Sequence, residues 1–169
     1  MDRLQIMDQA GVYARLKRIA FEIYEQHFQA SQLLMFGIEE RGYFLAEEIA
    51  QYLTEISDLE VKLGEVHVDR SGEEGEFGID IPIDLEELKG QVVVLVNDVL
   101  HTGRTLLNVS SILLHAVPSC IQTVVLINRG HRVMPVSSDY VGLELATTIH
   151  QHVSVAIDLE AREAAVFLE

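Results

Sequence analysis

Short apolar runs alternate with amphipathic segments along most of this chain, a pattern typical of strands that alternate with helices. Three apolar runs predict buried strands, at residues 32–37, 92–96 and 121–127, and the partial alternation at residues 60–68 predicts a further strand. Apolar residues at helical spacing predict three helices, one beginning at Asp8 as N-cap and two spanning 44–53 and 106–116. Since strand–helix–strand units favour parallel pairing, we expect an α/β fold with a doubly wound, mostly parallel central sheet flanked by helices.

The two ends of the chain and one internal segment complete this pattern. Residues 4–6 predict a short strand, and the tail predicts three more, at 140–141, 153–157 and 165–167. Residues 69–78 contain three glycines and several acids, so we expect a mobile loop there. We find no internal repeat and no Pro- or Ser-rich linker, and therefore expect residues 1–169 to form a single domain.

Composition and charge narrow the class of protein. A chain of 169 residues with 49% hydrophobic residues can bury a globular core. The single cysteine excludes an intrachain disulfide, and neither a signal peptide nor an apolar run of the ~18 residues needed to span a membrane is present. We therefore expect a cytoplasmic protein with no membrane partner. The net charge of −15 repels nucleic-acid phosphates, so RNA is not an expected partner.

The most informative segment runs from Val92 to Thr105. We predict that its buried strand ends at Asn97-Asp98 and that a loop then ends in Thr102-Gly103-Arg104-Thr105, just before a helix. Glycine allows the backbone N–H groups to turn inward, and the helix dipole favours an anion. Polar residues at the carboxyl end of a strand lie where open α/β sheets bind ligands. The segment therefore predicts a phosphate site.

This segment resembles the phosphoribosyl-pyrophosphate (PRPP) motif of type I phosphoribosyltransferases, in which a hydrophobic strand and two acids precede Thr-Gly-Arg/Lys-Thr. Two further segments resemble the pyrimidine-operon attenuator / uracil phosphoribosyltransferase family in particular. Asn128-Arg-Gly-His-Arg-Val-Met-Pro, continuing to Asp139-Tyr-Val-Gly142, is similar to that family's Asp-Arg-Gly-His-Arg-x-Leu-Pro and Asp-Tyr-Val-Gly. Gly37-Ile-Glu-Glu-Arg-Gly42 resembles its pyrophosphate loop, Gly-Ile-x-Thr-Arg-Gly. The three segments occur in the order of the family.

The resemblance implies a type I phosphoribosyltransferase fold with a small hood and a mobile lid loop. It implies an enzyme that moves ribose 5-phosphate from PRPP to a nucleobase, uracil first, and releases a nucleotide and pyrophosphate. Mg²⁺ is the implied cofactor, held by substrate oxygens, with Asp98 as the one protein group that could add a ligand. We also expect a homo-oligomer, a dimer being the simplest form.

The resemblance also assigns roles to individual residues. The 5′-phosphate loop comprises Leu100, His101, Thr102, Gly103, Arg104 and Thr105. The catalytic residues are Asn97 and Asp98 at the ribose and Arg70 in the lid. Pyrophosphate is assigned to Glu40, Arg41 and Gly42, and the base and hood to Arg129, Arg132, Val133 and Met134. These segments hold five of the twelve lysines and arginines, so an acidic protein can still offer an anion local positive charge.

Three departures from the family pattern bear on activity. Asn97 replaces one of two acids, Glu40 replaces a threonine beside a second acid, Glu39, and Asn128 replaces an acid. A missing carboxylate weakens stabilisation of a positive ribosyl carbon, and added carboxylates repel pyrophosphate. Two alternatives therefore stay open: a catalytically weakened PRPP- or nucleotide-binding or sensing protein, and an RNA-binding regulator. His101, where the family has tyrosine, either contacts phosphate or only packs.

Overall fold

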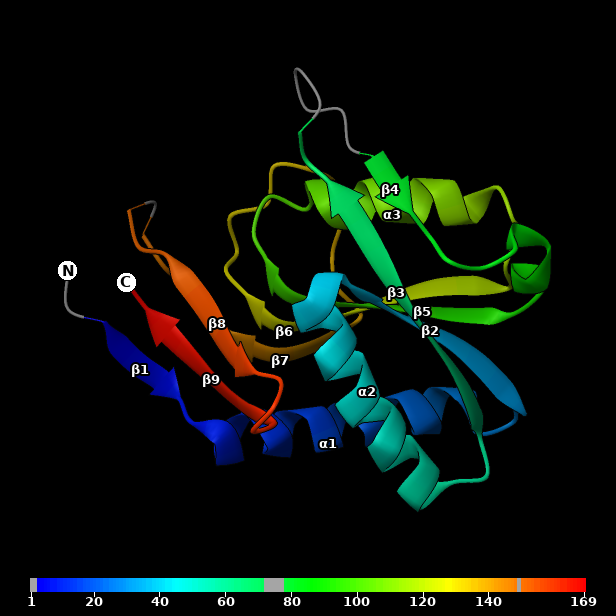
Figure 1. Ribbon diagram of the computed structural model, residues 1–169, viewed down its shortest axis with the longest axis horizontal. Helices are drawn as coiled ribbons and strands as arrows, with labels where there is room; N and C mark the ends of the chain where they lie inside the picture. The colour runs from blue at the N-terminus through cyan, green and yellow to red at the C-terminus, as the bar shows by residue number, and fades with distance from the viewer. Residues whose placement is uncertain (1–2, 72–77, 149) are drawn as a thin grey trace.

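A central sheet organises the computed structural model, which describes residues 3–71, 78–148 and 150–169 (Figure 1). Within these residues the sheet has six strands in the order β4-β3-β2-β5-β6-β7. Their bounds are β2 (Gln32–Ile38), β3 (Glu60–Asp69), β4 (Gly78–Asp80), β5 (Val92–Leu100), β6 (Cys120–Asn128) and β7 (Tyr140–Glu144). All neighbours are parallel except β4, which pairs antiparallel with β3. The predicted mostly parallel sheet is confirmed.

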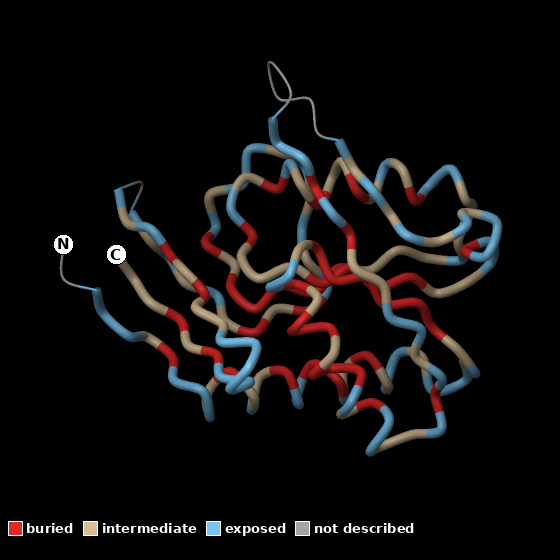
Figure 2. Tube along the Cα trace, in the orientation of Figure 1, coloured by how far each residue is buried: buried red, intermediate tan, exposed pale blue. Residues whose placement is uncertain are grey.

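Helices cover both faces of this sheet. Figure 1 shows α1 (Gln9–His27) and α2 (Glu39–Ile56) on one face and α3 (Arg104–Leu114) on the other. Each face has its own buried cluster, and both appear as buried segments at the centre of Figure 2. The predicted N-cap of α1 is confirmed, because the Asp8 carboxylate accepts a hydrogen bond from the Gly11 N–H at 2.8 Å. A short 3₁₀ helix, η2 (Leu85–Leu88), precedes β5.

A second, smaller sheet lies apart from the central one, and we call it the hood. The residues assigned to the base and hood from the sequence, Arg129, Arg132, Val133 and Met134, lie outside it, between β6 and β7. The hood joins β1 (Leu4–Met7) from the start of the chain to β8 (Val153–Asp158) and β9 (Glu163–Leu168) from its end, in the antiparallel order β1-β9-β8. The inward side chains of β8 and β9 belong to the same buried cluster as α1 and α2; they are Val153, Val155, Ala164 and Val166. The hood is therefore packed on the helical layer by a continuous apolar core.

The structure corrects the local predictions in three places. The strand at 92–96 does not break at Asn97 but continues to Leu100, because Asn97, Val99 and Leu100 pair with β6. No separate loop follows β2, since α2 begins directly at Glu39. The strand β4 was not anticipated. Of the loop predicted to be mobile, residues 72–77 lie outside the described residues. No described helix is long and apolar enough to cross a membrane.

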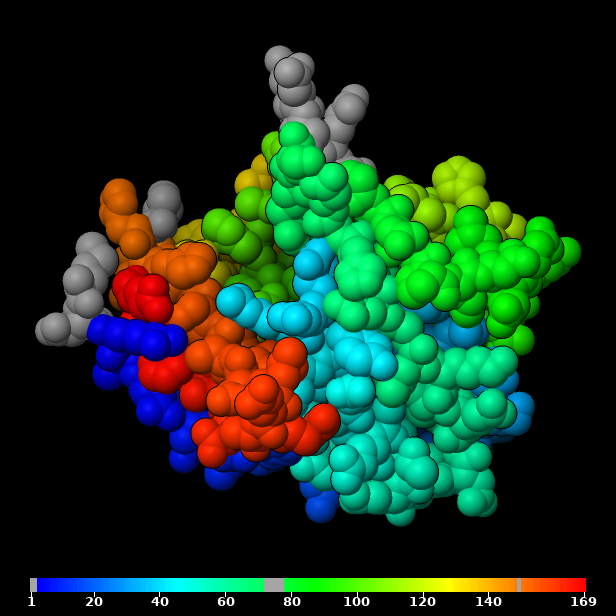
Figure 3. Space-filling model, viewed as in Figure 1, coloured from blue at the N-terminus to red at the C-terminus, as the bar shows by residue number. Residues whose placement is uncertain are grey.

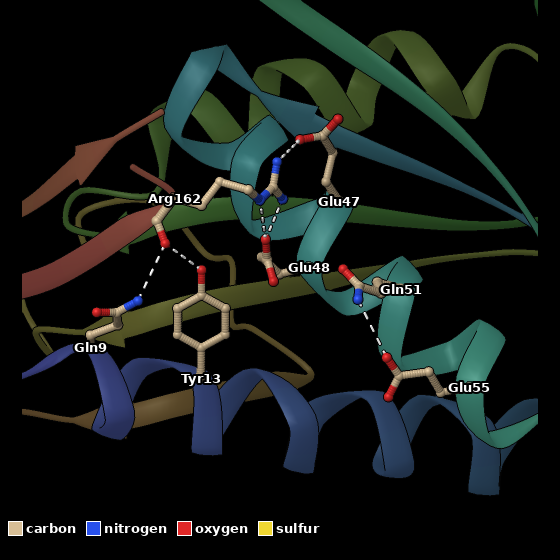
Figure 4. Close-up of polar contacts among 7 residues, drawn as sticks. All are labelled: Gln9, Tyr13, Glu47, Glu48, Gln51, Glu55 and Arg162. Atoms are coloured by element: carbon tan, nitrogen blue, oxygen red, sulfur yellow. Dashed lines mark hydrogen bonds and ion pairs between the residues drawn. The ribbon is translucent and has the colours of Figure 1, made fainter. Parts of the chain in front are cut away.

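An ion-pair cluster joins the hood to both helices beneath it (Figure 4). Arg162, in the β8–β9 turn, donates from Nε to the buried carboxylate of Glu48 at 3.0 Å and makes a second bond to it from Nη2. Its carbonyl oxygen accepts a hydrogen bond from the Tyr13 hydroxyl of α1 at 2.7 Å. Because Glu48 is only 5% exposed, its charge depends on this partner.

We expect Arg162→Met to lower the free energy of unfolding by about 2 kcal/mol, because it leaves the Glu48 carboxylate buried and unpaired. The loss is smaller than for a fully buried pair, since the Arg162 side chain is half exposed and solvent screens its charge. The double change Arg162→Met, Glu48→Leu should recover most of that loss, since it removes both charges. Urea unfolding of the wild type and the variants measures this. A double variant less stable than Arg162→Met would contradict the assignment of the loss to an unpaired Glu48.

Candidate active site

A cleft of about 480 Å³ opens at the carboxyl ends of β3 and β5, beside the first turn of α2. Figure 3 shows this side of the molecule, with the end of β3 above the start of α2. The lining residues come from three elements: Ile38, Glu39, Glu40 and Arg41 from the β2–α2 junction, Glu65, His67 and Arg70 from β3 and the residue after it, and Asn97 and Asp98 from β5. The structure thus brings the predicted ribose, pyrophosphate and lid residues together.

The first turn of α2 lies unusually close to the sheet. A Cβ added to Gly42 would stand 2.5 Å from the carbonyl oxygen of Val96 in β5, so no larger residue fits without movement. This approach places the Arg41 guanidinium 3.6 Å from the Asp98 carboxylate across the cleft. The two residues assigned to pyrophosphate and ribose therefore face each other across the cleft.

The two acids that depart from the family pattern behave differently. Glu39 has a positive φ of 58°. Its carboxylate accepts a hydrogen bond from the Val68 N–H at 2.6 Å, which ties the turn to the end of β3. Glu40 is exposed and has no hydrogen bond to any described residue. Glu39 is thus held in a structural contact, whereas Glu40 leaves a negative charge at the mouth of the cleft.

Asn97 and Asp98 are both held by the backbone of Val99. The Asn97 amide Nδ2 donates to the Val99 carbonyl at 3.1 Å, and Asp98 Oδ1 accepts from the Val99 N–H at 2.7 Å. An aspartate at position 97 could not make the first of these bonds, because a carboxylate has no N–H to donate. Asn97 therefore fits this strand locally, in addition to removing a charge from the cleft.

A second hollow, of about 60 Å³, adjoins the cleft at Asn97 and is lined by residues 99–106. All six residues assigned to the 5′-phosphate loop line it. Gly103 has a φ of +84°, a backbone conformation that favours glycine, and α3 begins at the next residue. The hollow is of the size of one small anion, and the first residues of α3 and two threonines line it. The structure thus brings the residues assigned to the 5′-phosphate together around one hollow.

Of the four residues assigned to the base, only Arg129 lines a hollow described here. Arg129 is only 3% exposed; its guanidinium donates to the Thr147 hydroxyl at 3.3 Å and to the Gln151 carbonyl. With His131 and Glu144 it lines a hollow of about 280 Å³ at the ends of β6 and β7. Arg132, Val133 and Met134 do not line any of these hollows. The Val133 and Met134 N–H groups both donate to the Thr102 carbonyl at 3.0 Å, so this segment braces the phosphate loop.

His101 lines the phosphate hollow and lies near three basic residues, Arg129, His131 and His152. Burial lowers the pKa of its imidazole below the usual range, and the nearby charges of Arg129, His131 and His152 lower it further. His152 thus lies near enough to His101 to influence its charge.

Sequence reasoning missed two residues of the cleft, Glu65 and His67. Both lie near the carboxyl end of β3 and on the same side of that strand, since side chains two residues apart share a face. The strand itself was predicted, so its alternation and its parallel neighbours could have indicated them.

Comparison with known proteins agrees with this geometry. A family model described as a phosphoribosyl transferase domain matches residues 2–160. The chain belongs to the phosphoribosyltransferase family. The bifunctional protein PyrR of Geobacter sulfurreducens is 39% identical over 99% of this chain and 98% of its own length. Bifunctional protein PyrR 1 of Lactiplantibacillus plantarum is 35% identical over 91% and 90%. The resemblance seen in three short segments is thus confirmed, and the protein is a phosphoribosyltransferase.

Solved structures of phosphoribosyltransferases share the fold. A hypoxanthine phosphoribosyltransferase of Staphylococcus aureus superposes with a TM-score of 0.74 at 18% identity, covering 88% of this chain and 80% of its own. The enzyme from Trypanosoma cruzi gives a TM-score of 0.77 at 18% identity, covering 96% and 89%. At this identity the likeness shows the type I fold and not the base.

We expect an anion in the phosphate hollow to raise the pKa of His101, which is lowered in the free protein. A ligand that raises a pKa binds more tightly as the pH falls through that group's titration range. Sulfate, which stays a dianion, should therefore bind more tightly as the pH falls below about 6.5, the ordinary value for histidine. Calorimetry at several pH values measures this, and His101→Gln should flatten the dependence. An equal dependence in His101→Gln would assign it to another group.

Proposed function

We propose that this phosphoribosyltransferase transfers ribose 5-phosphate from PRPP to uracil, forming UMP and pyrophosphate. The observation that supports it is the junction of two sites at Asn97: an anion-sized hollow at the start of α3 and a larger cleft at the start of α2. PRPP carries one phosphate at C5 of its ribose and a pyrophosphate at C1. A molecule with two anionic ends joined by a ribose matches a hollow and a cleft joined at one residue.

In this proposal the 5′-phosphate lies in the hollow formed by Thr102, Gly103, Arg104 and Thr105. Asn97 and Asp98 face the ribose, and the pyrophosphate lies in the cleft near Arg41, with Arg70 above it. The base nitrogen bonds to C1 as the bond from C1 to the pyrophosphate oxygen breaks, and the nitrogen loses its proton. Positive charge on C1 develops beside Asp98, and negative charge on the leaving group develops beside Arg41.

Mg²⁺ fits this site only together with substrate. Within the described residues, no three His, Cys, Asp or Glu side chains are grouped to hold a metal ion. Mg²⁺ is commonly bound by one or two carboxylates plus substrate phosphates, and Asp98 is placed to be such a carboxylate. Bound there, the ion would supply positive charge against the pyrophosphate oxygens. Asp98 already faces Arg41 and the Val99 N–H, which keeps its carboxylate oriented toward the cleft.

The acidity of the cleft supports a second candidate, a protein of this family with weakened catalysis. Four carboxylates line the cleft, namely Glu39, Glu40, Glu65 and Asp98. Only two arginines and one histidine line it with them. Excess negative charge opposes pyrophosphate binding. The net charge of −15 also argues against an RNA partner.

Steady-state release of pyrophosphate from PRPP, measured with uracil and separately with hypoxanthine, tests the proposal and its alternatives. Turnover that depends on uracil supports the proposal. Binding of PRPP and UMP with negligible turnover supports the weakened protein, and turnover with hypoxanthine alone would overturn the choice of base.

We expect Thr105→Val to weaken UMP binding by roughly 1–3 kcal/mol, because it removes a hydroxyl donor to a charged phosphate while keeping the shape of the side chain. Thr105 lines the phosphate hollow at the first turn of α3. Calorimetric titration with UMP measures the change. Thr148→Val, at an exposed position between β7 and β8, serves as a matched control and should leave the affinity unchanged. Equal affinities for Thr105→Val and the wild type would refute this placement of the phosphate.

We expect Glu40→Thr to lower the KM for PRPP, because it removes an exposed like charge from the mouth of the cleft. Asn97→Asp should raise kcat/KM, since it adds negative charge near C1, and every ~1.4 kcal/mol of transition-state stabilisation is tenfold in rate. Its carboxylate must turn from the Val99 carbonyl toward the cleft. Steady-state kinetics of the wild type, both variants and the double variant measure these effects. If neither change helps, these residues do not limit catalysis.

A further inference from the structure

We infer that His67, oriented by Glu65, is a pyrophosphate-binding residue of this enzyme, an inference that rests on the proposed function. The pyrophosphate residues assigned from the sequence all belong to the start of α2, on one side of the cleft. His67 and Glu65 would provide the opposite wall, from β3.

The position of both residues follows from the register of the sheet. Gly37 of β2 pairs with Glu65, and Ile38, the last residue of β2, pairs with Val66. The part of β3 that begins at His67 therefore extends beyond the end of β2. Val66 and Val68 point into the buried cluster under α3. The side chains of Glu65 and His67 therefore lie on the opposite face, the one covered by α2. Because α2 begins just there, that face is open and lines the cleft.

The orientation of the imidazole follows from its partner. His67 Nδ1 lies 3.6 Å from Glu65 Oε1, and the Glu65 side chain is the more buried of the two, at 28% against 58% exposed. A carboxylate on one ring nitrogen favours the proton there and leaves the other nitrogen for a second partner. Nε2 has no hydrogen bond to any residue that the structure describes. In the protonated ring both nitrogens donate, so Nε2–H can bond to a phosphate oxygen.

The charges around the cleft explain why such a donor is needed. Five carboxylates lie near this wall. They are Glu65 on β3, Asp80 opposite His67 on β4, Glu39 and Glu40 on α2, and Asp98 on β5. Of the two arginines that line the cleft, Arg41 already faces Asp98. Carboxylates repel a phosphate, whereas an imidazole N–H donates a hydrogen bond to a phosphate oxygen and adds no negative charge to this wall. His67 thereby converts part of the acidic lining into support for an anion.

Two substitutions separate the Nε2 contact from the mere presence of a side chain. His67→Gln keeps an N–H donor close to the position of Nε2, whereas His67→Asn places its amide near Nδ1. We expect His67→Asn to weaken binding of pyrophosphate, titrated calorimetrically at fixed Mg²⁺, on the order of tenfold, the size of a lost bond to a charged group. His67→Gln should retain most of the affinity. The KM for PRPP should rise in parallel with kcat little changed.

UMP provides the internal control, because it fills the phosphate hollow and carries no pyrophosphate. UMP affinity should be unchanged in both variants, and so should every measurement on His115→Gln, an exposed histidine at the far end of α3. Equal pyrophosphate affinity in His67→Asn and the wild type would overturn the inference. Parallel losses of pyrophosphate and UMP affinity would also overturn it, since they indicate a structural role. If the wild type binds neither PRPP nor UMP, the proposed function itself fails.

Discussion

The close approach of α2 to the sheet is the constraint on which the active-site geometry depends. Without a side chain at Gly42, the first turn of the helix rests against the Val96 carbonyl of β5. Arg41 consequently reaches Asp98, and Glu39 reaches the backbone of β3. A helix that began one turn later would leave β3 and β5 without a cleft shared with α2. Backbone packing, more than any single polar contact, therefore creates the site.

The two proposed anion sites of the molecule differ in their electrostatics. The hollow at the start of α3 relies on backbone N–H groups, hydroxyls and a helix dipole, which need no net charge. The cleft at the start of α2 relies on side-chain charges, and carboxylates outnumber cations there. A protein of net charge −15 can keep the first kind of site with little modification. The second kind requires compensation, by a divalent cation, by Arg70 and by a donor such as His67.

The hood and the segment that follows β6 act on the site from a distance. Arg162 fixes the β8–β9 turn to α2 through Glu48, and Arg129 fixes Thr147 and Gln151 to the end of β6. The N–H groups of Val133 and Met134 hold the Thr102 carbonyl and so shape the phosphate loop. Residues that resemble a base-binding segment in sequence thus contribute here to the rigidity of the neighbouring site.

Much of the fold was predictable because its determinants are local. Apolar runs and helical spacing identify β2, β3, β5, β6 and the three helices, and Asp8 marks the start of α1 through a bond within one turn. Gly103 and Thr105 indicate a phosphate loop for the same reason, since its shape depends on one positive φ and one helix start. The strand β4 was missed because three residues carry too little pattern.

What the tertiary structure alone decided concerns contacts between segments far apart in the chain. The sequence shows that Glu39 and Glu40 are both acidic, but only the pairing of β2 with β3 ties Glu39 to Val68 and leaves Glu40 exposed. The sequence places Arg129 in a segment that resembles the family's base-binding segment, but only the fold buries this arginine against Thr147. His67 enters the cleft because the register carries β3 beyond β2. The type of each charge and the local conformation depend on residues that are adjacent in the sequence. Which charges come into contact depends on the register of the strands.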